Sequence, residues 1–310
     1  MRRYAFIFGL LLGSIAVPAT LAGQGLDTDL EVYEFSDGLS HRNVFKILQD
    51  TTGMIWLATI NGLNSFDGYV FRTYNPGSVQ GKLPVEMVAD MVLGPDQKFV
   101  LASPDFLTSF VPEERKALAH QIKPGELVRR ESLAPHNLCF VDEQLWCTVY
   151  DEKNGQNWLA RQQQDHLELI RRLPGSGAKR AMASWRGHLI MASGNNKLEI
   201  LASDGKLLRT LEIGTDTVGA SPVAALCVHD EELWVLLEDG RIYIQASEEK
   251  VAVRWGKIPF TRTDAQLSAL LVEEDLDVWV GGLGTLWYYD HWQKSWVDYD
   301  QSIRQELKNT

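Results

Sequence analysis

The stretch from Phe35 to Gly68 decides the fold and reads F-S-D-G-L-S-H-R-N-V-F-K-I-L-Q-D-T-T-G-M-I-W-L-A-T-I-N-G-L-N-S-F-D-G. An apolar run at Val44 to Leu48 ends at a polar turn, Asp50-Thr51-Thr52-Gly53, and a second apolar run around Trp56 follows. Asn61-Gly62 then precedes a third run at Leu63 to Phe66. Gly, Asp and Asn suit such turns because they accept positive φ or bond their own backbone. The stretch therefore predicts three short antiparallel strands in succession.

The same hairpin recurs along the chain. Trp56, Trp146, Trp234 and Trp279 each follow a polar turn, at spacings of 90, 88 and 45 residues, or multiples of about 44. Phe99 and Leu189 fall near the two missing positions. The six hairpin turns are Asp50-Thr51-Thr52-Gly53, Gly94-Pro95-Asp96-Gln97, Asp142-Glu143-Gln144, Arg186-Gly187-His188, Asp230-Glu231-Glu232 and Glu274-Asp275-Leu276-Asp277. We expect the four tryptophans to be buried on equivalent strands of different repeats.

A third strand and a more polar fourth strand follow most hairpins, as in Lys206 to Ile213 and Ser295 to Tyr299. Four short strands per repeat of about 44 residues predict an all-β fold, a β-propeller of four-stranded antiparallel blades. An antiparallel sandwich also has regular short strands. It does not explain a tryptophan repeated at one hairpin position, so the propeller is favoured.

Phe35 to Gly68 resembles the two-component regulator propeller repeat, with its D-G-L, V-x-x-I-x-x-D-x-x-G-x-x-W-x-x-T and G-L-x-x-x-D/Y-G elements. The matching residues are Asp37, Gly38, Leu39, Val44, Ile47, Asp50, Gly53, Trp56, Thr59, Gly62, Leu63, Asp67 and Gly68. Asp277 to Asp290 carries a weaker copy, and the middle repeats keep mainly the hairpin.

The resemblance implies a periplasmic sensor propeller. In that family the propeller continues through a linker β-domain and a transmembrane helix to a histidine kinase or diguanylate cyclase. The sequence up to Thr310 contains none of these output domains. We therefore expect either a free-standing exported propeller or one part of a longer receptor.

Six hairpins favour six blades, with seven possible. Glu31 to Phe35 reads as a spare outer strand ahead of the first hairpin. We predict that it pairs with the sixth blade near Leu286 to Tyr289 or Ser295 to Tyr299, which would close the ring. An incomplete seventh blade is the alternative, and it would leave an exposed strand edge.

The N-terminus reads as a secretory signal peptide. Arg2 and Arg3 precede an apolar stretch from Ala5 to Val17, and Ala19-Thr20-Leu21-Ala22 offers small residues for cleavage after Ala22. An uncleaved membrane anchor is the alternative. We predict a signal peptide over 1–22, a single propeller domain over 23–300 and a C-terminal tail over 301–310, with a helical turn at Ser302 to Lys308. The mature protein should be periplasmic or secreted, with no transmembrane span.

The net charge of the chain argues against one class of function, general nucleic-acid binding. The chain of 310 residues carries 30 Lys+Arg against 41 Asp+Glu, a net charge of −11. Loss of Arg2 and Arg3 with the signal peptide takes the charge to −11 − 2 = −13. An acidic protein of this kind is a poor general ligand for nucleic acid, whose phosphates demand basic surface.

No enzymatic or metal-binding motif stands out. The seven histidines show no metal-ligand spacing, and no phosphate-binding loop or kinase motif occurs. We therefore predict no enzyme activity, no cofactor and no metal. A propeller lyase or glycosidase remains an alternative, and would need convergent carboxylates or a histidine–carboxylate cluster.

Ligands of propellers usually meet the rim where loops enter the innermost strands and join the second and third strands. Polar and charged residues in those loops are the predicted ligand-binding set: His41, Arg42, Asn61, Lys82, Asp105, His136, Asn137, Lys179, Arg180, Asn195, Asn196, Asp239 and Arg262. They fit a polar ligand such as a carbohydrate, or a membrane signalling protein. A protein-interaction scaffold without a small ligand is the alternative.

Cys139 and Cys147 lie on the two strands of the third hairpin. A three-residue turn would place them directly opposite, where a disulfide is chemically allowed in an oxidising compartment. Buried packed thiols are nevertheless the favoured interpretation, because direct cross-strand disulfides are strained. Cys227 is expected to be a small core residue.

Overall fold

The structure is a computed structural model, and it describes residues 33–79, 82–104, 107–124, 133–151, 153–164, 166–174, 181–214, 219–249, 251–259 and 266–299. The chain divides into two units, Met1–Val32 and Tyr33–Thr310. All described residues belong to the second unit. The predicted signal peptide over 1–22 and the whole predicted tail over 301–310, with its helical turn, lie outside the described residues.

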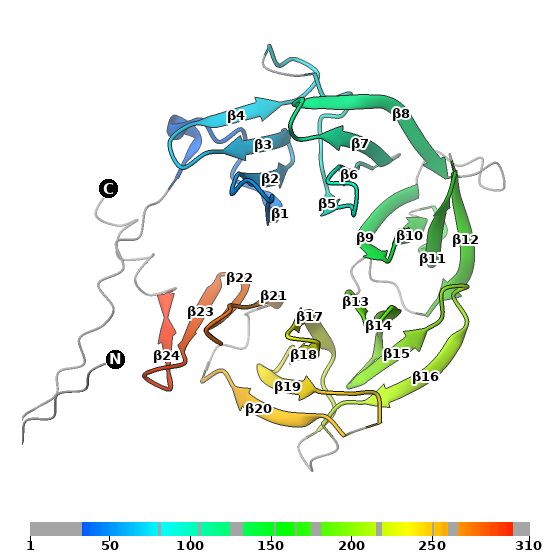
Figure 1. Cartoon of the computed structure of the whole chain (residues 1–310), viewed down its shortest axis with the longest axis vertical. Helices are drawn as coiled ribbons and strands as arrows, with labels where there is room; N and C mark the ends of the chain where they lie inside the picture. The colour runs from blue at the N-terminus through cyan, green and yellow to red at the C-terminus, as the bar shows by residue number, and fades with distance from the viewer. Residues whose placement is uncertain are drawn as a thin grey trace, which may run out of the picture. The chain divides into compact units, whose positions relative to one another are not determined.

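Six four-stranded antiparallel sheets follow one another along the chain (Figure 1). Blade 1 contains β1 (Val44–Gln49), β2 (Ile55–Thr59), β3 (Gly62–Phe66) and β4 (Phe71–Tyr74). Blade 2 contains β5 (Asp90–Leu93), β6 (Phe99–Ala102), β7 (Leu107–Val111) and β8 (Lys116–Pro124). Blade 3 contains β9 (Leu133–Val141), β10 (Gln144–Asp151), β11 (Gln156–Gln163) and β12 (His166–Leu173).

The second half of the chain repeats this plan. Blade 4 contains β13 (Met182–Trp185), β14 (His188–Gly194), β15 (Lys197–Leu201) and β16 (Leu207–Glu212). Blade 5 contains β17 (Val223–His229), β18 (Glu232–Leu237), β19 (Arg241–Gln245) and β20 (Val253–Lys257). Blade 6 contains β21 (Gln266–Val272), β22 (Val278–Leu283), β23 (Thr285–Asp290) and β24 (Ser295–Asp298).

The first strands of the blades pack in chain order, β1 with β5, β5 with β9, β9 with β13, β13 with β17 and β17 with β21. Each blade is a simple meander, so its first strand is innermost and its fourth is outermost (Figure 1). The predicted all-β propeller with six four-stranded blades is therefore confirmed.

Five apolar cores fill the interfaces between successive blades. Trp56 of blade 1 packs with Met91 and Phe99 of blade 2, and the remaining four interfaces contain equivalent clusters of buried side chains. We call the side of a blade that meets the next blade its forward face, and the other side its back face. Because both faces of a blade are apolar, each blade is stabilised by burial against two neighbours.

The tryptophan repeat is confirmed for three of its four members. Trp56, Trp146 and Trp234 lie on the second strand of their blades, on the forward face, and are at most 2% exposed. Trp279 has the same position on β22 but is only half-buried. Blade 6 has no following blade among the described residues, which explains its greater exposure.

The assignment of Phe99 and Leu189 to the tryptophan position was wrong by one residue. Both side chains are buried, but Phe99 belongs to the core shared with blade 1 and Leu189 to the core shared with blade 3. They therefore lie on back faces. Val100 and Ile190, the next residues, occupy the forward face. A shift of one residue moves a side chain to the other face of a strand.

Asp50 explains why the first hairpin has its sequence. Its carboxylate accepts hydrogen bonds from the Thr52 amide at 2.9 Å, the Met54 amide at 3.1 Å and the Trp56 indole at 2.8 Å. Partial burial opposes ionisation of Asp50, but these bonds outweigh it and hold its pKa below the ordinary value. One carboxylate thus fixes both the turn and the orientation of the core tryptophan.

Asp67 has the same role in the next turn. It accepts hydrogen bonds from the amides of Val70 at 2.9 Å and Tyr69 at 3.1 Å, and pairs with Arg72 at 2.7 Å. The bond from Val70, followed by the Arg72 contact, lowers its pKa to about 2. Gly62 is the first residue of β3 and has φ 96°. A Cβ at this position would lie 2.2 Å from the Tyr74 carbonyl oxygen, so only glycine fits.

The entering chain lies on the back face of blade 1. Phe35–Asp37 forms a 3-10 turn, and the Tyr33 ring contacts Phe66 and Phe71 with centroids at 4.8 and 5.5 Å. Leu39 joins Phe66 and Phe71 in a small buried cluster. The predicted pairing of this segment with blade 6 is therefore wrong for residues 33–35, because aromatic packing holds them on blade 1. Glu31 and Val32 lie outside the described residues.

Ser40 secures the end of this entering segment. Its amide donates to Asn64 Oδ1 at 2.9 Å, and its hydroxyl bonds Thr59 Oγ1 at 3.0 Å and Asn64 Nδ2 at 2.6 Å. All three side chains are buried. The network satisfies these polar groups on an otherwise apolar face and fixes the point at which the chain turns into β1.

Blades 2 and 3 share a continuous eight-stranded sheet. Their outermost strands, β8 and β12, pair in parallel, with Lys123 opposite His166 and Pro124 opposite Leu167. The parallel pairing of β8 with β12 can be followed at the outer edge in Figure 1. Among the described strands, this is the single ladder between different blades.

The predicted opposition of Cys139 and Cys147 was wrong. Cys139 lies opposite Trp146, because the turn is one residue shorter than expected. Cys139 packs on the forward face of blade 3 and Cys147 on its back face, so both are free, buried thiols. Burial raises the pKa of each thiol to about 12.

The position of each tryptophan predicts its contribution to stability. Trp146→Ala should lower the free energy of unfolding by about 3–5 kcal/mol, because it leaves a cavity between blades 3 and 4. Trp279→Ala should cost only about 1–2 kcal/mol, because part of its ring is already in solvent. Chemical denaturation of both variants tests this, and equal losses would contradict the end position of blade 6.

Candidate functional site

In a meander blade the connections from second to third strand and from fourth strand to the next blade emerge at the same end. We call this end the ligand rim, and the end with the first-to-second and third-to-fourth turns the hairpin rim. Seven of the predicted residues lie at the ligand rim: His41, Arg42, Asn61, Lys82, Asn195, Asn196 and Asp239. Asp105, Lys179, Arg180 and Arg262 lie outside the described residues.

The structure brings Asn61 and Lys82 together through a residue that the sequence analysis missed. The Asn75 amide nitrogen donates to Asn61 Oδ1 at 3.3 Å, and the backbones of Asn75 and Lys82 form a parallel bridge. Asn61 and Lys82 are exposed. Amide groups and an ammonium group thus share one part of the ligand rim, between blades 1 and 2. Neighbouring amides and a cation suit a polar or anionic ligand.

His41 and Arg42 stand on the same side of the ring, just before β1. His41 Nδ1 accepts a hydrogen bond from the Asn43 amide at 3.0 Å, which orients the imidazole. Arg42 is exposed. The Asn61 side chain also approaches the Ser40 carbonyl oxygen, at 3.4 Å. The buried Ser40 network therefore fixes the backbone beneath this part of the rim.

His136 and Asn137 are not loop residues, contrary to prediction. Both lie within β9, at a bulge where Asn137 has φ 52°. The Asn137 side chain donates to Thr148 Oγ1 at 2.7 Å, and the following amide, of Leu138, donates to Asp90 Oδ2 at 2.8 Å. The Asn137 bond lies within blade 3, and the Leu138 bond links the innermost strands of blades 2 and 3. Both predicted residues therefore belong to the innermost strand of blade 3 and not to a rim loop.

Asp239 is held by an arginine that is almost completely buried. The Arg241 guanidinium donates to Asp239 Oδ2 at 2.6 and 2.8 Å, and to the Gly219 carbonyl oxygen at 2.6 Å. The Arg241 side chain is 1% exposed and that of Asp239 is 34% exposed. Burial opposes ionisation of Asp239, but the Arg241 contacts outweigh it and lower the pKa of the carboxyl.

The Asn195–Asn196 turn is tied to the neighbouring blade. Asn195 forms an isolated bridge with Pro222, and the Asn196 side chain donates to the Ile213 carbonyl oxygen at 2.8 Å. Asn196 Oδ1 also accepts from the Ser221 amide at 2.6 Å. Asn196 therefore positions the connection between blades 4 and 5, while Asn195 remains exposed at the rim.

A cavity of about 310 Å³ lies on the ligand rim at blade 3. Its lining residues come from the start of β11 and the end of β12: Gly155, Gln156, Arg172, Leu173 and Pro174. None of them was in the predicted set. They are separated in sequence and share no motif, so only the fold brings them together.

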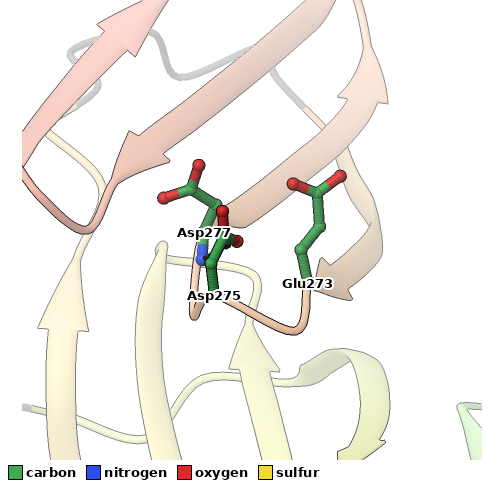
Figure 2. Close-up of side chains that lie close together, drawn as sticks. All are labelled: Glu273, Asp275 and Asp277. Atoms are coloured by element: carbon green, nitrogen blue, oxygen red, sulfur yellow. Dashed lines mark hydrogen bonds between the residues drawn. The ribbon is translucent and has the colours of Figure 1, made fainter. Parts of the chain in front are cut away.

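Three carboxylates gather at the hairpin rim of blade 6 (Figure 2): Glu273, Asp275 and Asp277. One oxygen from each lies within 4.8 Å of the others, an arrangement that fits a hard cation. Asp277 is already engaged, because it accepts hydrogen bonds from the Tyr288 hydroxyl and, at 2.8 Å, from the His291 amide. The other two are exposed, as turn carboxylates commonly are.

Comparison with known proteins yields one matching sequence segment. No family model matches the chain. Histidine kinase P4 of Formosa agariphila is 35% identical over 74 residues. This alignment covers 24% of the chain and 5% of the kinase. The chain thus spans a small part of the curated relative that it matches.

Solved structures match over most of the chain. One is described as the extracellular domain of a hybrid two-component system of B. thetaiotaomicron, with a TM-score of 0.58 and 13% identity. The alignment covers 83% of this chain and 36% of the solved chain. The Dos1 propeller aligns with a TM-score of 0.54 and 9% identity. The alignment covers 80% of this chain and 67% of the Dos1 chain. The fold that these comparisons show is that of a β-propeller. At these identities the likeness extends to the fold alone.

The Asp239–Arg241 pair predicts a pH-dependent stability. Asp239→Ala should lower the free energy of unfolding by about 3 kcal/mol at pH 7, because it leaves a buried guanidinium without its carboxylate. This value lies at the low end of the range for breaking a buried ion pair, because Asp239 is partly exposed.

The sign of the pH effect follows from the lowered pKa of Asp239. Its contribution is complete above the ordinary carboxyl pKa of about 4 and is lost as the pH falls through the lower folded value. Asp239→Asn should therefore weaken the acid sensitivity of the melting temperature between about pH 5 and 2. An unchanged pH profile would contradict this assignment.

Proposed function

We propose that this protein is the exported, non-enzymatic sensor module of a two-component or cyclic-dinucleotide signalling system. The single observation that carries the proposal is the six-bladed propeller, whose structural neighbours include extracellular domains of two-component systems. The resemblance of the first repeat and the signal peptide predicted from the N-terminal sequence support it. None of the helices in the described ranges is long and apolar enough to span a membrane.

The ligand that the rim fits best is a polar molecule such as a carbohydrate. Asn61, Asn75 and Lys82 provide amide and ammonium groups, which can hydrogen-bond hydroxyl or carboxylate oxygens. The cavity beside Arg172 offers a second location on the same rim. Its volume is at the lower end for small-molecule sites, near that of a sugar unit or two.

Calorimetric titration of mature protein with neutral and acidic oligosaccharides tests this assignment. Lys82→Ala and Arg172→Ala distinguish the two locations, and Lys98→Ala is the matched control because it lies in a hairpin-rim turn. We expect one rim variant to weaken binding about tenfold, which corresponds to about 1.4 kcal/mol. The control should bind normally.

A scaffold without a small ligand would give a different result. No oligosaccharide would bind, and the mature propeller would instead bind a membrane signalling protein directly. Equal weakening of oligosaccharide binding by Lys98→Ala would also contradict a binding site on the ligand rim. It would indicate a nonspecific effect of charge.

Absence of phosphotransfer chemistry is a second expectation. Purified mature protein should neither hydrolyse ATP, nor phosphorylate itself, nor synthesise cyclic dinucleotides, since it carries no phosphate-cradling or kinase motif. Incubation with labelled ATP and GTP measures all three. Stoichiometric phosphorylation of the isolated chain would overturn the non-enzymatic assignment, and turnover of an oligosaccharide would favour the lyase or glycosidase alternative.

A further inference from the structure

The first strands of the six blades line the centre of the ring, and one position on them can be compared in every blade (Figure 1). It is the residue opposite the second residue after the tryptophan position. In blades 1, 5 and 6 it directly follows a bulge, which marks the same point on all three strands. The six equivalent residues, in blade order, are Lys46, Asp90, His136, Ala181, Ala225 and Ala269.

The composition of this position differs between the two halves of the ring. Blades 1 to 3 carry ionisable side chains there, and blades 4 to 6 carry alanine. We call Lys46, Asp90 and His136 the ionisable arc. The tryptophan position faces forward and side chains alternate along a strand, so the arc residues also belong to the forward faces of their blades. Three consecutive innermost strands thus present ionisable groups at one level of the ring.

Lys46 carries an ammonium group without a counter-charge. The residue is exposed, although Leu48, two residues further along the same face, packs with Trp56 in the core between blades 1 and 2. Lys46 forms no ion pair with any described residue. By contrast, Arg72 and Lys206 each pair with a carboxylate at 2.7 Å. The ammonium group of Lys46 is therefore available to a ligand at the centre of the ring.

Asp90 is oriented by backbone groups. Its carboxylate accepts hydrogen bonds from the Met91 amide at 2.9 Å and from the Leu138 amide of blade 3 at 2.8 Å. Asp90 is half-buried, and no described cation forms an ion pair with it. A carboxylate has about four acceptor positions, so two amides fix its place and leave capacity for a further donor.

Lys46 and Asp90 lie near each other without pairing. Their strands pack together, β1 with β5, and β5 packs in turn with β9. Both charges reach the Cys139 thiol on β9. Burial is the main cause of the raised pKa of this thiol, while Lys46 lowers the pKa and Asp90 raises it. The ionisable arc therefore contains two separate charges of opposite sign within reach of one small molecule.

We propose that the ionisable arc binds a small zwitterion, an α-amino acid, with its carboxylate on Lys46 and its ammonium group on Asp90. A simple anion is repelled by Asp90 and a simple cation by Lys46, whereas a zwitterion brings the opposite charge to each. Both contacts are charge-assisted hydrogen bonds, which are stronger than neutral ones. This site is separate from the carbohydrate location proposed on the ligand rim and does not depend on it.

A neutral sugar is the less suitable occupant of the arc. Its hydroxyl groups can bond an ammonium or a carboxylate group. It would, however, displace water from both charges without compensating either of them, which costs free energy. The bonds from Met91 and Leu138 hold Asp90 in place before any ligand arrives, so a zwitterion meets a carboxylate that is already oriented.

Calorimetric titration of the mature protein with the standard L-amino acids, one at a time, tests the proposal. The tightest binder is then compared with its N-acetyl derivative, which lacks the ammonium charge, and with its amide, which lacks the carboxylate charge. We expect each modification to weaken binding by about tenfold or more, because each removes one charge-assisted contact.

Variants assign each charge of the ligand to a residue. Lys46→Met should weaken binding of the free amino acid about tenfold and abolish its advantage over the amide, whereas Lys46→Arg should preserve both. Asp90→Asn should abolish the advantage over the N-acetyl derivative. The melting temperature reports whether Asp90→Asn folds, and the Lys46 variants, at an exposed position, decide the test if it does not.

Two controls separate the arc from other sites. Lys98→Met removes an exposed lysine at the hairpin rim and should leave amino-acid binding unchanged. Lys82→Ala, on the ligand rim, should also leave it unchanged, because the arc and the rim are distinct locations.

Four results would overturn the proposal. The first is that no amino acid binds at millimolar concentration. The second is equal binding of the free amino acid and its two blocked forms. The third is equal weakening by Lys98→Met and Lys46→Met, which would indicate a nonspecific effect of charge. The fourth is binding of a neutral oligosaccharide that Lys46→Met abolishes, which would assign the arc to a sugar.

Discussion

Every blade of this protein is apolar on both faces, and this constraint governs the rest of the structure. A single four-stranded sheet cannot bury both faces by itself, so each blade depends on a neighbour at either side. The five interblade cores satisfy the constraint within the array. At the two ends it has to be met differently. On blade 1 the entering segment from Tyr33 to Ser40 covers the back face, with a buried polar network at its end.

The first blade could be predicted in detail because its sequence encodes local bonds. Asp50 bonds its own turn and the core tryptophan, and Asp67 bonds the next turn, so each appears as a fixed residue at a fixed spacing. Such contacts span a few residues and can be read from the sequence. In the drifted middle blades the forward and back faces were exchanged at Phe99 and Leu189.

Features that depend on register or on distant segments could not be read from the sequence. A hairpin turn of two residues, in place of the expected three, puts Cys139 opposite Trp146 and not opposite Cys147. Aromatic contacts between Tyr33 and blade 1 override the strand pattern of the entering segment. At the rim, Asn61 and Lys82 meet through Asn75, whereas Asp239 is neutralised by Arg241. The sequence Asp239-Gly240-Arg241 offered a signal for that pair, because the two residues flank one tight turn.

The parallel pairing of β8 with β12 makes the stiffness of the ring uneven. Blades 2 and 3 are joined by backbone hydrogen bonds as well as by a packed core, whereas the other described junctions rely on side-chain packing without a shared ladder. Backbone ladders resist shear, while packed faces can slide by small amounts. The outer edges of blades 2 and 3 are therefore fixed to each other by main-chain bonds that do not depend on which side chains fill the core between them.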